Sequence, residues 1–259
     1  HQAGVPSGVF NLVMGRGSVV GEAIVASRKI DAISFTGSVA TGRKIAVRCA
    51  ELGRKLQLEM GGKNPLVVLD DADLGVAVSS AVNGAFYSTG QRCTASSRLI
   101  VTEGIHDAFV AAMKEATARL VVGDALKPET QIGPVVDDSQ LRQDLFYTDL
   151  AKRESAEVFG GRLLSRETKG FYLEPALFLN TGNGMRINRE EIFGPSASVI
   201  RVKDYDEALA VANDTEFGLC AGICTRSLRH ASHFQRHAEA GMVMVNLPTA
   251  GVDYHVPFG

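Results

Sequence analysis

Residues 30–62 read IDAISFTGSVATGRKIAVRCAELGRKLQLEMGG, and this stretch decides the fold. A strand-like run over residues 30–35 ends in Thr36-Gly37-Ser38, residues 41–52 have helical periodicity, and a second strand over 55–58 ends in Glu59-Met60-Gly61-Gly62. Strand, glycine turn, helix and strand in this order predict a βαβ unit in a parallel sheet. Glycine and serine at the carboxyl ends of such strands lie where an open α/β sheet binds its ligand.

The same alternation continues on both sides of this stretch. Upstream, we expect a short buried strand at 9–14, a turn at Gly15-Arg16-Gly17 and a helix over 18–28. Downstream, the pattern predicts strands at 65–69, 98–101, 172–179, 199–202, 219–225 and 242–246, helices at 74–87, 106–120, 140–157, 207–213 and 229–240, and a charged loop at 187–195. The sequence therefore predicts an α/β protein with a partial first domain in residues 1–60 and a second domain in residues 61–259.

The composition narrows the class of protein and of partner. The 259 residues are 45% hydrophobic and 22% charged, which is typical of a soluble globular chain. A net charge of -2 without a basic tract argues against nucleic acid or a membrane surface as a partner, and no apolar run approaches the ~18 residues of a membrane span. The chain starts at His1 without a start methionine or a signal peptide, and both ends look cut, so we expect a fragment of a longer protein.

Four cysteines, Cys49, Cys93, Cys220 and Cys224, are sparse and irregularly spaced, which favours free thiols in the reducing cytoplasm. Cys93 lies in the segment GQRCTA (residues 90–95), between an apolar helical run and a strand, in poor surroundings for a core residue. A nucleophilic cysteine acts as the thiolate and needs positive potential or N–H donors nearby. We expect Cys93 to be a nucleophile and the other three cysteines to be buried core residues.

Two glycine-containing turns are candidates for binding a nucleotide. Gly37, Ser38 and Gly42 open a helix directly after a strand, so backbone N–H groups and the Ser38 hydroxyl would face the helix N-terminus, which attracts anions. The alternative is that Ser38 only caps the helix. Gly17 belongs to Gly15-x-Gly17-x-x-x-Gly21, which is a loose version of a dinucleotide-binding fingerprint.

Glu59 ends an apolar strand, where a carboxylate contributes little to packing. A partly desolvated carboxylate at a strand end is suited to act as a general base. The alternative is an ion pair with a neighbour such as Lys63.

Three histidines and an acidic turn are the remaining candidates for a functional site. His230, His233 and His237 have helical spacing, but no cysteine or carboxylate completes a metal site, so we expect a solvated helix face and no bound metal. Residues 190–195, EEIFGP, place two acids beside Phe193 in a turn, which indicates a shaped wall.

Together these segments resemble the aldehyde dehydrogenase superfamily. Residues 58–63, LEMGGK, resemble the family's ELGGK segment; residues 86–95, FYSTGQRCTA, resemble its cysteine segment; and the separation of Glu59 from Cys93 matches that of the family. Residues 35–38 with Gly42 resemble its cofactor-binding segment. Residues 190–195, 213–219 and 257–259 match further segments, in the family's order along essentially the whole chain.

The resemblance implies that an aldehyde is oxidised to a carboxylic acid with NAD or NADP. Cys93 would attack the aldehyde, the resulting thiohemiacetal would pass a hydride to the nicotinamide, and Glu59 would deprotonate the water that hydrolyses the thioester. The residues that the resemblance places at the cofactor are Gly17 near the adenosine, Gly37, Ser38 and Gly42 at the pyrophosphate, Met60 in place of the family's leucine, and Glu191 and Phe193 at the nicotinamide ribose and ring. The implied fold is the last part of a Rossmann-like cofactor domain followed by an α/β catalytic domain.

Family members are longer than this chain. The resemblance implies that most of the cofactor sheet, the residues that separate NAD from NADP and a second oxyanion donor lie upstream of His1. We therefore expect the 259 residues alone to bind cofactor poorly and to turn over little or not at all. We expect the parent protein to be a homodimer or a homotetramer.

Residues 245–259, VNLPTAGVDYHVPFG, resemble the corresponding segment of family members that oxidise 2,5-dioxopentanoate to 2-oxoglutarate. Succinate semialdehyde or another aldehyde is the alternative substrate. Two hypotheses from other classes stay open: a cysteine hydrolase or acyltransferase that uses Cys93 with a histidine such as His255, and a catalytically silent fragment.

Overall fold

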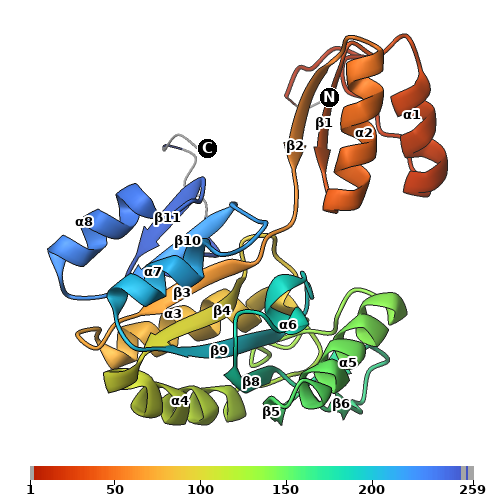
Figure 1. The fold of residues 1–259 in the computed structure, drawn as a ribbon. Coiled ribbons are helices and arrows are strands. Elements are labelled where there is room, and N and C mark those ends of the chain that lie inside the picture. Colours follow the sequence, from red (N-terminus) through yellow and green to blue (C-terminus); the bar gives the residue numbers. More distant parts are fainter. Residues whose placement is uncertain (1–2, 252–254, 256–259) are drawn as a thin grey trace. The chain divides into compact units, whose positions relative to one another are not determined.

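The computed structural model describes residues 3–251 and residue 255, which fall into two compact units, His1–Gly61 and Gly62–Gly259 (Figure 1). The motif at residues 257–259 and part of the segment 245–259 lie outside the described residues. None of the helices formed by the described residues combines the length and the hydropathy needed to cross a membrane. The two units are described one after the other.

The first unit contains a strand–helix–strand arrangement with parallel strands, as predicted. Its elements are η1 (Gly17–Gly21), α1 (Glu22–Ala26), β1 (Ala32–Thr36), α2 (Val39–Glu51) and β2 (Lys55–Glu59). β1 and β2 pair in register from Ala32 with Lys55 to Thr36 with Glu59. Ser38 begins α2 by accepting a hydrogen bond from the Thr41 N–H at 3.3 Å. This pairing places the ends of both strands, and therefore the Ser38 turn and Glu59, at one edge of the sheet.

The predicted strand at residues 9–14 is wrong. These residues form irregular backbone, and their apolar side chains are exposed: Phe10 is 82% and Met14 80% accessible. The sheet described in this unit consists of β1 and β2, and residues 9–14 pair with neither. Strands are stabilised by cross-strand neighbours and by burial of a face, so an apolar run without either does not become one.

The second unit is built around a seven-stranded sheet with the order β11-β10-β3-β4-β9-β8-β5. Its strands are β3 (Asn64–Val68), β4 (Ser96–Thr102), β5 (Glu157–Gly160), β6 (Leu163–Leu164), β7 (Tyr172–Leu173), β8 (Ala176–Thr181), β9 (Ser196–Val202), β10 (Cys220–Cys224) and β11 (Met242–Val245). Its helices are α3 (Leu74–Phe86), η2 (Tyr87–Gly90), α4 (Glu103–Ala118), α5 (Asp138–Arg153), α6 (Arg186–Arg189), α7 (Tyr205–Asn213) and α8 (Leu228–His237). The predicted α/β fold class is confirmed.

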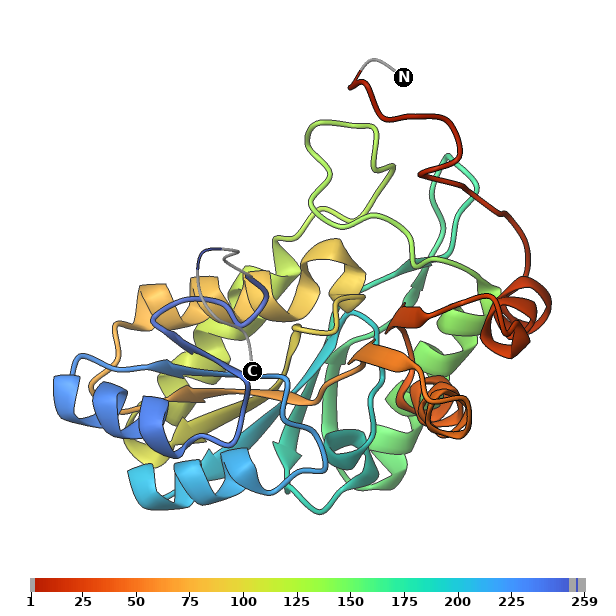
Figure 2. The same cartoon turned by 90° about the horizontal axis from the view of Figure 1, so that it is seen from above.

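Helices cover both faces of this sheet (Figures 1 and 2). Leu66 and Val68 of β3 belong to the core under α3 and α4, whereas Val67, between them, belongs to the core under α7 and α8. On β4, Leu99 belongs to the core under α3 and α4, and Ile100 belongs to the core under α7 and α8. Successive side chains of a strand point to opposite faces, so a strand buried on both faces needs the continuous apolar run that both strands carry.

The sheet differs from the prediction at one edge. β5 pairs antiparallel with β8, so the sheet is mixed, and the helix predicted to reach residue 157 ends as α5 at Arg153. The single strand predicted at 172–179 is two strands, β7 and β8, separated by Glu174-Pro175, because proline removes a ladder donor. The charged loop predicted at 187–195 begins with the short helix α6.

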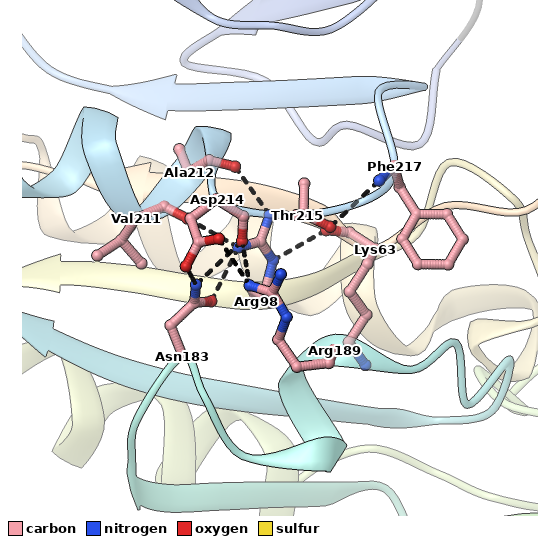
Figure 3. Close-up of polar contacts among 9 residues, drawn as sticks. All are labelled: Lys63, Arg98, Asn183, Arg189, Val211, Ala212, Asp214, Thr215 and Phe217. Carbon is pink, nitrogen blue, oxygen red and sulfur yellow. Dashed lines mark hydrogen bonds and ion pairs between the residues drawn. The ribbon is translucent and has the colours of Figure 1, made fainter.

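One buried arginine joins three segments of the second unit. Arg98 on β4 is 0% exposed, and Figure 3 shows its guanidinium surrounded by oxygen atoms. It donates to Lys63 O at 2.9 Å, Val211 O at 2.8 Å and Ala212 O at 2.9 Å, and to Asn183 Oδ1 at 3.0 Å. Burial lowers its pKa to about 10, with a further contribution from Arg189. The start of β3 and the end of α7 are therefore tied to β4 by a charged side chain that makes four hydrogen bonds.

We expect Arg98→Met to lower the free energy of unfolding by about 3 kcal/mol or more, because it leaves several buried acceptors without a donor. Arg98→Lys should recover only part of this loss, since an ammonium cannot reproduce the planar fork. Chemical denaturation of the complete gene product measures both. Arg119→Met is the matched control, since Arg119 has a 70% exposed side chain and should change stability by about 0.5 kcal/mol or less. Equal losses in Arg98→Met and Arg119→Met would contradict this role.

Candidate active site

Cys93 lies on a sharply bent connection between α3 and β4. Ser88 and Thr89 both have φ 56°, and Gly90 has φ +64°, so three successive residues adopt the left-handed region. Such conformations cost free energy for residues other than glycine and persist only where the surroundings fix them. The bend ends α3 and brings Cys93 into a partly exposed position, whereas Cys49, Cys220 and Cys224 are buried. The prediction that Cys49, Cys220 and Cys224 are buried is confirmed.

Asn64 holds the Cys93 segment in place. Its Nδ2 donates to Cys93 O at 2.7 Å and to Ala95 O at 2.9 Å, while its Oδ1 accepts from the Cys220 N–H at 3.1 Å. Asn64 is 2% exposed at the start of β3. One buried amide therefore satisfies two carbonyls of an irregular segment that has no ladder partners of its own. The role of Asn64 was not predicted, because nothing in its local sequence distinguishes it from other polar residues at a strand end.

The turn at residues 190–194 lies directly against the cysteine segment. A Cβ atom on Gly90 would fall 2.0 Å from Gly194 O, so the two backbones are in contact. Phe193 has φ 60°, in the left-handed region that residues other than glycine rarely adopt. Residues of both segments line a small cavity of about 20 Å³, among them Arg92, Glu191 and Phe193. The structure thus brings Glu191 and Phe193 next to the segment that carries Cys93.

The backbone of Gly62, at the start of the second unit, orients the side chain of Glu191. Its Oε1 accepts from the Gly62 N–H at 3.1 Å. Burial raises the pKa of the Glu191 carboxyl, and the Gly62 N–H and the positive charge of Lys63 oppose that shift. A half-desolvated carboxylate with its second oxygen available can accept hydrogen bonds from the hydroxyls of a ligand.

Helix α5 supports the same turn from its other side. Gln140 and Gln143 both donate to Ile192 O, at 3.1 and 2.7 Å, and Tyr147 Oη donates to Glu190 Oε2 at 2.7 Å. The three side chains are spaced i, i+3 and i+7, which places them on one face of the helix. These contacts from α5 were not predicted, although polar residues at this spacing indicate a polar face of the helix.

Lys63, which directly precedes Asn64, is also buried. It is 1% exposed, and its Nζ has no hydrogen-bond partner among the described residues. Burial first and Arg98 second lower its pKa to about 7, while Glu191 and Glu190 raise it. Its backbone carbonyl is one of the oxygens that Arg98 binds.

In the first unit, the Ser38 turn and the end of β2 form one polar edge. The Gly37 N–H donates to Glu59 O at 3.0 Å. A Cβ atom on Gly42 would lie 2.5 Å from Met60 Sδ, so the Met60 side chain packs directly against α2 and would have to shift for any larger residue at position 42. The structure therefore places Gly37, Ser38, Gly42, Glu59 and Met60 together. Ser38 caps α2. A cap does not exclude a ligand at the same helix N-terminus, so both interpretations of this serine stay open.

The first unit also contains a cavity of about 680 Å³, lined by η1, α1, β1 and α2. Gly17 lies at its wall, with the apolar side chains of Val25, Phe35 and Ile45, and with Lys44 and Arg48. A mostly apolar cavity of this size with a few charged groups is the usual form of a small-molecule site. A purine base requires apolar walls of this kind, whereas the phosphates of a nucleotide require positive charge.

The sequence of the chain matches the aldehyde dehydrogenase family over residues 1–259. The chain belongs to the aldehyde dehydrogenase family. The alpha-ketoglutaric semialdehyde dehydrogenase of Bacillus subtilis is 43% identical over 262 residues, which cover 100% of this chain and 54% of the relative. A betaine aldehyde dehydrogenase of Cereibacter sphaeroides is 41% identical over 249 residues, which cover 95% of this chain and 50% of that protein.

The fold agrees with solved structures of this family. An indole-3-acetaldehyde dehydrogenase of P. syringae, solved in complex with NAD+ and IAA, matches with a TM-score of 0.96 and 37% identity. The match covers 100% of this chain and 52% of that one. The chain thus spans about half the length of the aldehyde dehydrogenases that it matches.

The remaining candidate residues form no site of their own. His233 stacks on His237 with ring centroids 4.0 Å apart, Tyr205 stacks on His230 at 4.5 Å, and the Tyr205 hydroxyl lies 2.7 Å from His233 Nδ1. Among the described residues, no group of three or more His, Cys, Asp or Glu side chains is arranged to hold a metal ion. The histidines instead pack with Tyr205 at the surface of α7 and α8.

We expect iodoacetamide to alkylate Cys93 about tenfold or more faster than the other three cysteines, because only Cys93 is partly exposed. Burial raises the pKa of the Cys224 thiol to about 12, which removes its thiolate at neutral pH. Time-resolved alkylation with peptide mass spectrometry gives the four rates in one sample, so the buried cysteines serve as internal controls. Alkylation of Cys49 or Cys224 at the rate of Cys93 would show that the native packing differs from this structure.

Proposed function

We propose that the complete protein oxidises an aldehyde to a carboxylic acid with NAD or NADP, with residues 1–60 as part of the cofactor domain and residues 61–259 as the catalytic domain. The observation that carries the proposal is the position of Cys93. It is the partly exposed cysteine among four, on a segment that Asn64 and the turn at residues 190–194 fix in place. Preorganised placement of a nucleophile is what covalent catalysis requires.

In the proposed reaction, the Cys93 thiol and the Glu59 carboxylate act in separate steps. The Cys93 thiolate adds to the aldehyde carbon, and the carbonyl oxygen becomes an oxyanion that fixed N–H donors can stabilise. A nicotinamide bound at the site would accept the hydride that leaves this carbon, and a thioester on Cys93 remains. Glu59 then takes a proton from water, the hydroxide attacks the thioester carbon, and the carboxylic acid and the Cys93 thiol are released.

The proposed cofactor contacts follow from the two groups of residues described above. Gly37, Ser38 and Gly42 would hold the pyrophosphate at the N-terminus of α2, and Met60 would line the same edge. The cavity beside Gly17 would take the adenosine. In the second unit, Glu191 would accept hydrogen bonds from the nicotinamide ribose and Phe193 would contact the ring. The NAD+ bound in the P. syringae indole-3-acetaldehyde dehydrogenase, whose fold matches with a TM-score of 0.96, supports NAD(P) as the cofactor.

We propose 2,5-dioxopentanoate as the substrate. Support comes from the 43% identity to an alpha-ketoglutaric semialdehyde dehydrogenase and from Arg92, which precedes the nucleophile and adds positive charge. Positive charge beside a nucleophile favours an anionic aldehyde over the cationic betaine aldehyde. Betaine aldehyde dehydrogenases are nearly as similar in sequence, at 41% identity, so the charge of the substrate is the property to test. We further propose that the complete protein assembles as a homodimer or a homotetramer.

A substrate panel on the complete gene product tests the activity and its charge preference. We expect NAD(P)H formation with 2,5-dioxopentanoate at a kcat/KM about tenfold or more above that with betaine aldehyde, and with succinate semialdehyde between them. Parallel assays with NAD and NADP identify the cofactor. Absence of NAD(P)H formation with every aldehyde would overturn the proposed activity, and a preference for betaine aldehyde would overturn the proposed substrate.

Two variants separate the roles of the proposed catalytic residues. Cys93→Ser should lower kcat by about a thousandfold or more, because a serine hydroxyl is a far weaker nucleophile than a thiolate. Glu59→Gln should lower steady-state turnover by about 10²–10⁴-fold, yet keep a burst of NAD(P)H close to one equivalent per thiol, because hydride transfer precedes hydrolysis. Rapid-mixing absorbance measures both, with Glu51→Gln as an exposed acidic control in the same unit. Loss of the burst in Glu59→Gln would assign Glu59 to the first step instead.

A further inference from the structure

Asp144 on α5 is a buried carboxyl group behind the turn at residues 190–194. It is 3% exposed. Its Oδ1 accepts one hydrogen bond, from Gln140 Nε2 at 2.8 Å, and its Oδ2 has no partner among the described residues. A buried polar atom without a partner costs free energy, so its presence in a packed helix calls for a physical role.

Asp144 is in contact with the backbone of the turn. A Cβ atom on Gly194 would lie 1.9 Å from Asp144 Oδ1 and 2.8 Å from Oδ2, so the carboxyl lies directly against the Gly194 backbone. On its other side, Gly194 O is the atom that a Cβ on Gly90 would meet at 2.0 Å. Asp144, Gly194 and Gly90 therefore form a continuous stack from α5 to the segment that carries Cys93.

No charged side chain compensates the Asp144 carboxylate. On α5 the titratable side chains of Asp138, Arg142, Asp149, Lys152 and Arg153 are exposed, and Tyr147 is half-buried. The turn carries Glu190 and Glu191, and the cysteine segment carries Arg92. Tyr147 bonds to Glu190, Glu191 accepts from the Gly62 N–H, and Arg92 donates to the carbonyls of residues 83 and 84. Among the described residues, Gln140 is thus the one side chain that donates to Asp144.

We infer that Asp144 is a positioning residue whose protonation state controls how firmly the turn carrying Glu191 and Phe193 is held against the cysteine segment. The inference rests on the proposed function for its consequence, because Glu191 and Phe193 are proposed to contact the cofactor. The neutral carboxyl can stay buried against Gly194. The ionised carboxylate, with one donor and one free oxygen, gains free energy by moving toward water, which loosens the stack.

The direction of the pH effect follows from the burial. Desolvation raises the pKa of Asp144 to about 7, and the hydrogen bond from Gln140 opposes the shift. The folded protein therefore holds this proton where the unfolded chain has lost it. The stabilising effect is complete below the unfolded pKa of about 4, decreases as pH rises, and is gone above about pH 7.

Hydrogen exchange in the complete gene product tests the inference without relying on catalysis. After correction for the intrinsic exchange rate, peptides covering residues 187–196 should exchange several times faster at pH 8.5 than at pH 6. Asp144→Asn and Asp144→Leu should remove this pH dependence, because neither side chain titrates. Asp149→Asn, on the same helix with a 71% exposed side chain, should behave as the unmodified protein. A corrected exchange rate that does not change with pH in the unmodified protein, or that changes equally in Asp144→Asn, overturns the inference.

Binding of NADH, followed by its fluorescence, tests the functional consequence. If the neutral carboxyl is required, the Kd should rise about 3- to 30-fold between pH 6 and pH 8.5 in the unmodified protein, because the competent fraction falls. The Kd of Asp144→Asn and Asp144→Leu should stay nearly constant over that range. If the protein binds no NADH at any pH, the proposed function fails, while the exchange experiment still decides the role of Asp144. Equal pH responses in all proteins would leave Asp144 a packing residue.

Discussion

The amide group of Asn64 is the interaction on which the arrangement around Cys93 depends. A segment with three successive left-handed residues cannot satisfy its carbonyls through a regular ladder, yet buried carbonyls require donors. Asn64 supplies both missing donors from one side chain, and its own oxygen is occupied by the Cys220 N–H. Its position depends in turn on the preceding peptide, whose carbonyl Arg98 binds. The buried side chains of Asn64 and Arg98 thus link the central strands to the backbone of the segment that carries the thiol.

Much of the fold could be predicted from the sequence because its signals are local. The apolar runs of β3 and β4 are continuous, as strands buried on both faces must be, and α3 begins at Leu74, the predicted start, where Asp73 caps it. Residues 9–14 show the limit of that reasoning, since an apolar run indicates burial but does not supply a pairing partner. The same limit explains β5, whose antiparallel pairing depends on where α5 ends.

The candidate site was predictable only where chemistry is carried by one unusual residue in an unusual context. Cys93 and the turn at residues 190–194 stand out from their neighbours. Asn64, Gln140 and Gln143 do not, because each is an ordinary polar residue whose role comes from contacts with a segment distant in the chain. No local pattern records that Ile192 O needs donors from α5, since this need arises only once the turn is folded.

The buried polar groups of the second unit fall into two classes, and the difference is physically informative. Arg98 and Asn64 have all their principal hydrogen bonds satisfied, so they hold the core in a single arrangement. Lys63 Nζ, Arg92 Nε and Asp144 Oδ2 have no partners among the described residues, and all three belong to segments that adjoin the turn or the cysteine, whereas others such as Thr117 Oγ1 and His230 Nδ1 lie elsewhere. Unpaired polar atoms cost stability wherever they occur, and the three beside the turn and the cysteine carry ionisable groups. A region that tolerates this cost gains groups that can change charge or bind a ligand, whereas the satisfied side chains beneath it keep the thiol in position.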